Sequence, residues 1–299
     1  MINNKMGAVA ACAVLASVLA ACGSSSPSTS ASGSADTLVG AGSTLVAPLV
    51  SQWQPEYDKK AKVAVTYGAI GSGGGIEQIT ARTVDFGASD APLSESQFKE
   101  AKEVVQIPWA LAATVIAYHL EGAPNQLKLT GPLLAEIWEG KVTSWNAPAI
   151  AALNPGVTLP ATKITPIHRS DGSGDTFALT NYLSQISPEW KAKIGKGTEV
   201  PFPVGVGAKG NSGVGGAISS TNGSIGYIAI AYVLANKFDY ALIKNAAGNY
   251  PVPGIPSISA AAKALTTVPP DNELSIVNPP VSAPAAYPIS TFTYAIVPL

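Results

Sequence analysis

Residues 164–176 read ITPIHRSDGSGDT, and this stretch decides the fold class. The apolar and β-branched residues at its start predict a short strand that ends at Arg169. A loop of glycine, serine and aspartate follows, and the residues from Thr176 to Leu183 predict a helix. A strand, a small-residue loop and a helix in this order are typical of an α/β fold, in which such loops lie at the carboxyl ends of parallel strands.

The same order of strand, loop and helix recurs along the chain. Glycine, serine and alanine fill the loops at 40–45, 71–76 and 87–91, and each loop follows a strand-like pattern. We expect strands at 38–39, 63–67, 84–88, 164–169, 223–228 and 292–297, and helices that begin near residues 45, 76, 94, 130 and 176. The repeated unit extends the α/β prediction over most of the chain.

Some local signals are sharper than this general pattern. Ser94 and Gln97 have the spacing of a capping box at the start of a helix. Pro55 falls inside the helix predicted from residue 45, so we expect a kink or a break there. Residues 106–120 are largely apolar and predict one or two buried strands with a crossover.

Composition narrows the class of protein. The chain has 299 residues, of which 46% are hydrophobic and 12% are charged, so it can bury a large core and is not a disordered chain. The formal net charge is −1, without the basic excess typical of nucleic-acid binding. Two cysteines and two histidines are too few for a disulfide framework or a typical zinc site. We therefore expect no nucleic-acid partner, no metal and no cofactor.

The N-terminus carries the features of an export signal. Residues 1–21 contain one charge, at Lys5, and then a run of small apolar residues that is too short to span a membrane. The sequence LAACG at 19–23 resembles the lipobox of bacterial lipoproteins, in which the cysteine becomes the lipidated N-terminus. An ordinary signal peptide with a chance cysteine is the alternative. We expect residues 1–21 to be a signal peptide and Cys22 to carry the lipid.

Residues 22–36 predict a flexible tether, because they are rich in serine and contain no large apolar side chain. A lipid such as palmitate on Cys22 would anchor the folded part to the cell membrane without a membrane-spanning helix. The sequence thus predicts an extracytoplasmic, lipid-anchored protein.

Four of the loops share the features of an anion site: 40–45, 71–76, 87–91 and 169–176. Glycines at the start of a helix let several backbone N–H groups point at one anion, and serine and threonine hydroxyls add donors. Arg169 adds a fork-shaped cationic donor that can bind an oxyanion through two hydrogen bonds. One such loop is more often a simple turn, but four loops and an arginine together indicate an anion site.

Two acidic residues in these loops narrow the choice of anion. Asp90 and Asp175 would repel a fully ionised anion, so as ligands they must accept a hydrogen bond from it. Phosphate carries a proton near neutral pH and sulfate does not, so carboxylates that face inward predict a phosphate site that excludes sulfate. The alternative is that both residues cap helices from outside, and Asp175 has the position of an N-cap.

Several segments resemble one family of transport proteins. Residues 84–92 (VDFGASDAP) and 169–174 (RSDGSG) are the most specific. The others are GAGST at 40–44, GSGG at 71–74, LTGP at 129–132, IWEGK at 137–141, NPG at 154–156 and GAKGNSGV at 207–214. Together they resemble the phosphate-binding lipoproteins of phosphate-specific ABC transporters, of the actinobacterial type, over about 38–232 and 287–297.

The resemblance implies a set of phosphate ligands. Asp90 would accept the phosphate proton, and Arg169, oriented by Asp171, would be the cationic donor. Asp175 stands where many members have threonine, and the actinobacterial branch implies a second carboxylate at the ligand. The other implied donors are the hydroxyl and backbone N–H groups of Thr44 and Ser72, the helix-start donors Ser173 and Gly174, and the backbone N–H of Leu45, which replaces a phenylalanine common in the family.

The resemblance also implies a two-lobed α/β fold, the type II periplasmic-binding-protein fold, with the ligand in the cleft between the lobes. Lobe 1 would comprise residues 37–117 and 285–299, and lobe 2 would comprise residues 118–284. The family continues past the last strand with helices that complete lobe 1, so we expect the C-terminal part of lobe 1 to be incomplete here.

The function that the resemblance implies is a high-affinity receptor for inorganic phosphate, which delivers its ligand to an ABC permease in the membrane and is not an enzyme. One alternative is a binding protein for another oxyanion, such as sulfate or molybdate, whose site needs no carboxylate acceptor. Another is a secreted phosphatase that uses Ser72 or Ser173, but this would need a base or a metal cluster, and the sequence shows neither. A role as an adhesin or antigen could coexist with any of these.

Overall fold

The computed structural model describes residues 36–270 and 272–299. The predicted signal peptide, the lipidation residue Cys22 and nearly all of the predicted tether lie outside these residues, so those interpretations stay predictions. Within the described part of the chain, no helix is both long and apolar enough to cross a membrane.

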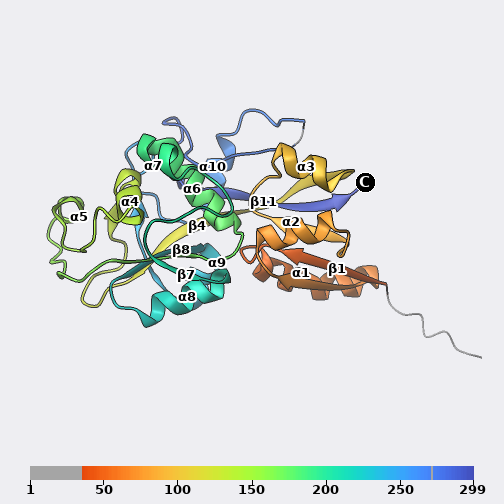
Figure 1. The fold of residues 1–299 in the computed structure, drawn as a ribbon, viewed down its shortest axis with the longest axis horizontal. Helices are drawn as coiled ribbons and strands as arrows, with labels where there is room; N and C mark the ends of the chain where they lie inside the picture. Colours follow the sequence, from red (N-terminus) through yellow and green to blue (C-terminus); the bar gives the residue numbers. More distant parts are fainter. Residues whose placement is uncertain (1–35, 271) are drawn as a thin grey trace, which may run out of the picture. The chain divides into compact units, whose positions relative to one another are not determined.

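Strands and helices alternate along most of the described residues, which confirms the predicted α/β order (Figure 1). The first elements are β1 (Thr37–Gly42), α1 (Ala47–Ala61), β2 (Ala64–Ala69), α2 (Ser72–Thr80), β3 (Phe86–Ser89), α3 (Glu95–Ala101) and β4 (Val104–His119). The next are β5 (Lys128–Leu129), α4 (Gly131–Trp138), α5 (Pro148–Leu153), β6 (Thr165–Arg169), α6 (Gly174–Ile186), α7 (Pro188–Lys193) and β7 (Val206–Ala208). The last are α8 (Gly210–Ser220), β8 (Ser224–Ala229), α9 (Ile230–Asn236), β9 (Asp239–Tyr240), β10 (Leu242–Ile243), α10 (Ile255–Lys263) and β11 (Ser290–Pro298).

One sheet runs in the order β2-β1-β3-β11-β4-β8-β6-β7, with β9 beside β4. β1 pairs in parallel with β2 and β3, and β6 pairs in parallel with β7 and β8. Between these groups, β4 pairs antiparallel with β11 up to Ala113 and with β8 from Thr114 onward. In these pairings, β3 and β6 both run toward the level of Thr114 in β4. The loops that follow their carboxyl ends therefore meet near the middle of β4.

The long strand β4 is the buried strand and crossover predicted at 106–120. The chain returns at the start of β11, where Thr114 N–H donates to Ile289 O at 3.0 Å. The predicted lobe boundaries at 117/118 and 284/285 lie close to these two crossings. The division into two lobes itself stays a prediction.

The sequence predicted two local features of helices, a capping box at Ser94 and an irregularity at Pro55. The capping box is confirmed: Ser94 Oγ accepts from Gln97 N–H at 3.3 Å, and Gln97 Oε1 accepts from Ser94 N–H at 2.9 Å. A kink or a break is predicted at Pro55: the break is wrong, because α1 continues through this residue to Ala61, and the kink stays a prediction. Proline removes one hydrogen-bond donor, and the packing of the buried Val50 with residues of the sheet offsets that loss.

The helix α2 begins at Ser72, earlier than the predicted start at residue 76, so three glycines lie in its first turns. A Cβ on Gly75 would lie 2.5 Å from the Cα of Gly42. Only glycine at this position lets the helix come so close to the end of β1, and this close approach explains the early start.

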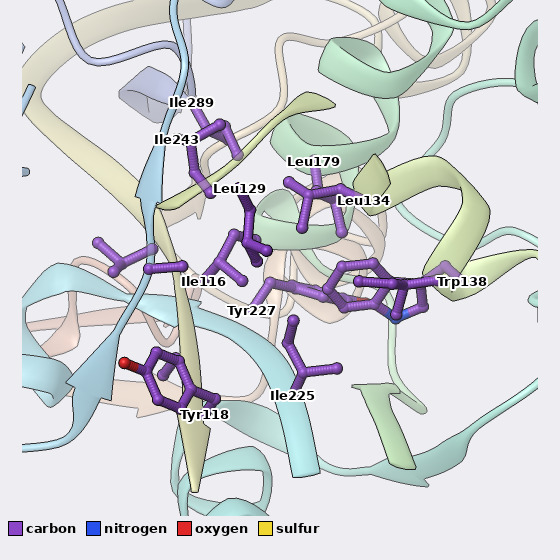
Figure 2. Packing of buried hydrophobic residues seen from close by; sticks show 14 of the residues in the cluster. Ile116, Tyr118, Leu129, Leu134, Trp138, Leu179, Ile225, Tyr227, Ile243 and Ile289 are labelled. Atoms are coloured by element: carbon purple, nitrogen blue, oxygen red, sulfur yellow. The ribbon is translucent and has the colours of Figure 1, made fainter. Parts of the chain in front are cut away.

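The largest hydrophobic core surrounds β4, β6 and β8 and the helices that cover them. Figure 2 shows Trp138 of α4 beside Tyr227 of β8, whose ring centroids lie 6.0 Å apart, with Ile116 of β4 close by. A smaller core includes Ile79 of α2 and Ile296 of β11. These cores hold the strand ends that carry the polar loops.

Candidate functional site

The structure brings together all four predicted anion loops. The Ser43 hydroxyl, in the loop after β1, donates to Asp90 Oδ1 in the loop after β3 at 2.6 Å. Ser72, at the start of α2, accepts through Oγ from Asp90 N–H at 3.2 Å and from Gly174 N–H, at the start of α6, at 3.1 Å. Loops that lie far apart in the sequence are thus joined by hydrogen bonds around Asp90 and Ser72.

Asp90 lies at the centre of this arrangement and is 2% exposed. The Ser43 hydroxyl lies 2.6 Å and 2.7 Å from its two carboxylate oxygens, and the Ser72 hydroxyl lies 3.3 Å from Oδ2. Burial and then the charge of Asp175 raise the pKa of Asp90 to about 7, while its hydroxyl donors and Arg169 act in the opposite direction. A carboxyl group with this pKa can accept or share a proton near neutral pH.

Arg169 ends β6 and its side chain is 1% exposed. Its Nε and Nη2 donate to the two carboxylate oxygens of Asp171 at 2.7 Å and 2.5 Å, and its Nη1 donates to Asp175 Oδ2 at 3.4 Å. Burial opposes ionisation of Asp171, but the hydrogen bonds from Arg169 and Gly210 N–H lower its pKa. The bidentate pair fixes the plane of the guanidinium group, as the predicted orienting role of Asp171 requires.

Asp175 lies inside α6 and does not cap it. The N-cap is Ser173, whose Oγ accepts from Thr176 N–H at 3.3 Å, so the alternative that Asp175 is an N-cap is wrong. Asp175 Oδ1 accepts from Thr114 Oγ1 at 2.7 Å, and Oδ2 accepts from Asn211 Nδ2 at 2.9 Å. Burial raises the pKa of Asp175, while the neighbouring arginine charge and these donors act in the opposite direction.

The remaining predicted donors lie in the same place and have partners within the protein. Leu45 N–H donates to Ser43 Oγ at 3.0 Å, and Ser173 N–H donates to Thr198 O at 3.0 Å. Thr44 is 7% exposed, and its hydroxyl oxygen accepts a hydrogen bond from a buried amide. The predicted set is thus assembled around Asp90, and the contact of each member with phosphate stays a prediction.

Besides Thr114, which donates to Asp175, sequence reasoning missed the buried polar residues Ser43 and Asn211 of this site. Ser43 binds Asp90, and Asn211 bonds to Thr44 and Asp175. Both residues lie in segments that carry the family resemblance, but no role was assigned to either. Asn211 follows a fifth loop, after β7, and this strand is only 3 residues long, so its pattern in the sequence is weak.

The side chains of the site suit anion binding. They supply hydroxyl, amide and guanidinium donors, together with two buried carboxylates. Over residues 36–270 and 272–299, no group of three or more His, Cys, Asp or Glu side chains could hold a metal ion. His168, beside Arg169 in the sequence, stacks on Phe202 with ring centroids 4.7 Å apart.

A family model described as a PBP superfamily domain matches residues 27–299. The chain is 46% identical to the phosphate-binding protein PstS of Xylella fastidiosa strain Temecula1, over 87% of this chain and 71% of that protein. It is 33% identical to the phosphate-binding protein PstS 3 of Mycobacterium leprae, over 98% of this chain and 85% of that protein.

A solved structure of a phosphate-binding protein from Stenotrophomonas maltophilia has a TM-score of 0.63 and 20% identity, over 88% of this chain and 79% of that one. This likeness confirms the predicted fold class, the type II periplasmic-binding-protein fold. Some relatives are considerably longer: the chain spans 61% of the PstS of Xylella fastidiosa strain 9a5c, to which it is 49% identical over 75% of this chain.

Proposed function

The chain belongs to the PstS family of phosphate-binding proteins, within the PBP superfamily, and on that premise we propose that it is a receptor for inorganic phosphate. The proposal rests on one observation above all: the buried carboxylate of Asp90 lies inside a group of hydrogen-bond donors. The receptor binds and releases its ligand unchanged, and it is not an enzyme.

Asp90 gives the site its selectivity. A protonated phosphate oxygen donates to this carboxylate, while the surrounding hydroxyl and N–H groups donate to the other oxygens. Sulfate has no proton to donate, so the same carboxylate would face it unpaired and repelled. A buried carboxylate and a phosphate oxygen at hydrogen-bond distance share one proton, because two negative charges so close together in a buried site cannot both be fully ionised.

The other ligands supply positive charge and donors. Arg169, held in plane by Asp171, neutralises the anion. Asp175 has three donors in this structure, and a carboxylate accepts about four hydrogen bonds, so one position remains for a second phosphate proton. The hydroxyls and backbone N–H groups of Ser72 and Ser173, with the backbone N–H groups of Leu45 and Gly174, exchange their present partners for phosphate oxygens. Thr44 keeps the hydrogen bond from Asn211 and donates its own hydroxyl hydrogen and its backbone N–H to phosphate.

Phosphate reaches the site when the two lobes separate. Gly73 N–H donates to Gly172 O at 3.0 Å and Gly174 N–H donates to Ser72 Oγ at 3.1 Å, so the loops of the two lobes close on each other at the site. The separation breaks these bonds and bends the chain where β4 changes partner, at Thr114, and where β11 begins. Binding of phosphate favours the closed arrangement, because only there do all the donors converge.

The location follows from the sequence of the N-terminus. After removal of residues 1–21, a lipid such as palmitate on Cys22 anchors the receptor to the outer face of the cell membrane, and residues 22–36 act as the tether. From there the receptor delivers phosphate to the permease subunits of an ABC importer.

Isothermal titration of inorganic phosphate, with sulfate in parallel, into the chain from Asp36 to Leu299 tests the proposed function. We expect saturable heat with phosphate alone at neutral pH. Equal binding of sulfate would replace the proposal with a general oxyanion receptor, and turnover of a chromogenic phosphate ester would replace it with a phosphatase. No heat from either anion, with a folded far-ultraviolet circular dichroism spectrum, would overturn the proposal.

A further inference from the structure

Asn211, the second residue of α8, is fully buried and uses both ends of its side-chain amide. Its Oδ1 accepts from Ala229 N–H at 2.8 Å, and its Nδ2 donates to Thr44 Oγ1 at 2.7 Å and to Asp175 Oδ2 at 2.9 Å. The three partners come from the end of β8, the loop after β1 and the first turn of α6. One amide therefore joins three separate segments beside the anion site.

The orientation of this amide is determined by its partners. A backbone N–H can only donate, so the oxygen of Asn211 must face Ala229 and its NH₂ group must face Thr44 and Asp175. The Thr44 hydroxyl oxygen is thus an acceptor toward Asn211, and its own hydrogen remains available for another acceptor.

We propose that Asn211 is a positioning residue for the anion site: by donating to Thr44 and Asp175 at once, it leaves the Thr44 hydroxyl hydrogen for a phosphate oxygen and keeps Asp175 as an acceptor. This inference rests on the proposed phosphate-binding function and adds to it a residue that does not itself contact the ligand. The same two bonds hold the loop after β1 against α6 and α8, so they also stabilise the closed arrangement of the site.

The variant Asn211→Asp tests the direction of these bonds. The new side chain has nearly the same shape and still accepts from Ala229 N–H, but it faces Thr44 and Asp175 with an oxygen in place of NH₂. Thr44 then donates its hydrogen to the new oxygen, and phosphate loses a donor. We expect phosphate affinity to fall by about tenfold to a hundredfold, the loss that follows when a buried polar group near a charge lacks its partner.

Asn154→Asp is the matched control. Asn154 is 7% exposed, its Oδ1 accepts from Lys128 N–H at 2.8 Å, and its Nδ2 donates to Lys128 O at 3.0 Å and to Ile150 O at 2.9 Å. The same substitution there destabilises the fold in a similar way without touching Thr44 or Asp175. The phosphate affinity of the folded Asn154→Asp protein is expected to equal that of the wild type, and an equal loss in both variants would overturn the inference.

A double variant separates positioning from a general structural effect. Thr44→Val alone removes the hydroxyl hydrogen from the site, and we expect about a tenfold loss of affinity. If Asn211 acts through Thr44, the variant with both Asn211→Asp and Thr44→Val binds phosphate no more weakly than Asn211→Asp alone. Losses that multiply would show that the two residues act independently and would overturn the inference.

A measurement without phosphate distinguishes failure of the inference from failure of the proposed function. Exchanging the two groups, as Asn211→Asp with Asp175→Asn, restores an amide opposite a carboxylate. The unfolding midpoint of the ligand-free double variant is expected to exceed that of Asn211→Asp alone. If the wild type bound no phosphate, the proposed function would fail, and this comparison would still decide whether Asn211 and Asp175 form the bond that the inference requires.

Discussion

Gly174 lies directly against Asp90, so that a Cβ on Gly174 would fall 2.3 Å from the Asp90 Cβ and 2.5 Å from its Oδ2. Carbon atoms in ordinary contact lie about 3.5–4.0 Å apart, so no side chain fits between the start of α6 and this carboxylate. The contact puts the positive end of the helix dipole beside the buried acid. Whether phosphate binding depends on this close approach between Gly174 and Asp90 can be tested by substitution.

Gly174→Ala is expected to weaken phosphate binding by about a hundredfold or more, because the methyl group forces the start of α6 away from Asp90 and the donors no longer converge. Isothermal titration measures the affinity. Gly216→Ala is the control, since a Cβ there meets nothing within 4 Å and Gly216 also lies in a helix. That variant should bind phosphate as the wild type does and should gain about 1 kcal/mol of stability. Equal affinities in the two variants would contradict the importance of the contact.

Asp90→Asn is expected to reduce strongly the ratio of phosphate affinity to sulfate affinity. The amide keeps the shape of the side chain, but its NH₂ group donates where the carboxylate accepts. Phosphate affinity should fall by about tenfold or more, and sulfate binding should become measurable. Competition titrations with both anions at one pH give the ratio directly, and an unchanged ratio would assign the selectivity to other groups.

The stability of the ligand-free protein should depend on pH through Asp90. Its pKa is about 7 in the folded protein, above the ordinary value of 3.8, so between these values the folded state binds a proton that the unfolded chain has lost. The free energy of unfolding therefore falls as the pH rises through this window and levels off above about pH 7. The raised pKa of Asp175 acts in the same direction.

Thermal unfolding from about pH 5 to about pH 8 measures this dependence. Asp90→Asn removes the titrating group, so its unfolding midpoint should change less over the same range and should exceed that of the wild type at the upper end. A wild-type midpoint that rose with pH would contradict the burial of an ionisable Asp90.

Asp171→Asn should lower phosphate affinity by about tenfold, because Arg169 loses one of the two oxygens that hold its guanidinium plane. Asp85→Asn provides the comparison: Asp85 Oδ2 also accepts a backbone N–H, from Val39 at 2.8 Å, but it has no contact with the site residues. Titration of phosphate into both variants is the measurement. The prediction fails if the two variants bind phosphate alike.

Two fully buried tryptophans should respond differently to replacement by phenylalanine. Trp145 Nε1 donates to Gly223 O at 2.9 Å, whereas Trp138 Nε1 has no hydrogen-bond partner among the described residues. Trp145→Phe removes one of the two donors to the Gly223 carbonyl, which keeps the hydrogen bond from Thr165 N–H at 3.0 Å, and should cost about 1 kcal/mol more than Trp138→Phe. Denaturant unfolding of both variants gives the difference, and equal losses would mean that the Trp145 hydrogen bond contributes nothing net.

The outcomes at individual residues show which features a sequence can reveal. The loops at Asp90 and Arg169 were found because each depends on a local order of strand, small residues and helix. A break at Pro55 was wrongly expected because its helix is stabilised by packing with the sheet, which no local pattern contains. Asn211 was missed because the strand before it, β7, is only 3 residues long and its partners lie far away in the sequence.

The sequence by itself determined the order of the elements, the loops that bear donors, and the chemical groups that Asp90 and Arg169 can offer. Tertiary structure alone decided that the four loops meet at Asp90, that Ser173 and not Asp175 caps α6, and that Asn211 joins Thr44 to Asp175. The physical reason is that a helix cap or a turn depends on neighbours in the chain. Burial, the raised pKa of Asp90 and the direction of a hydrogen bond depend instead on groups that only folding brings together.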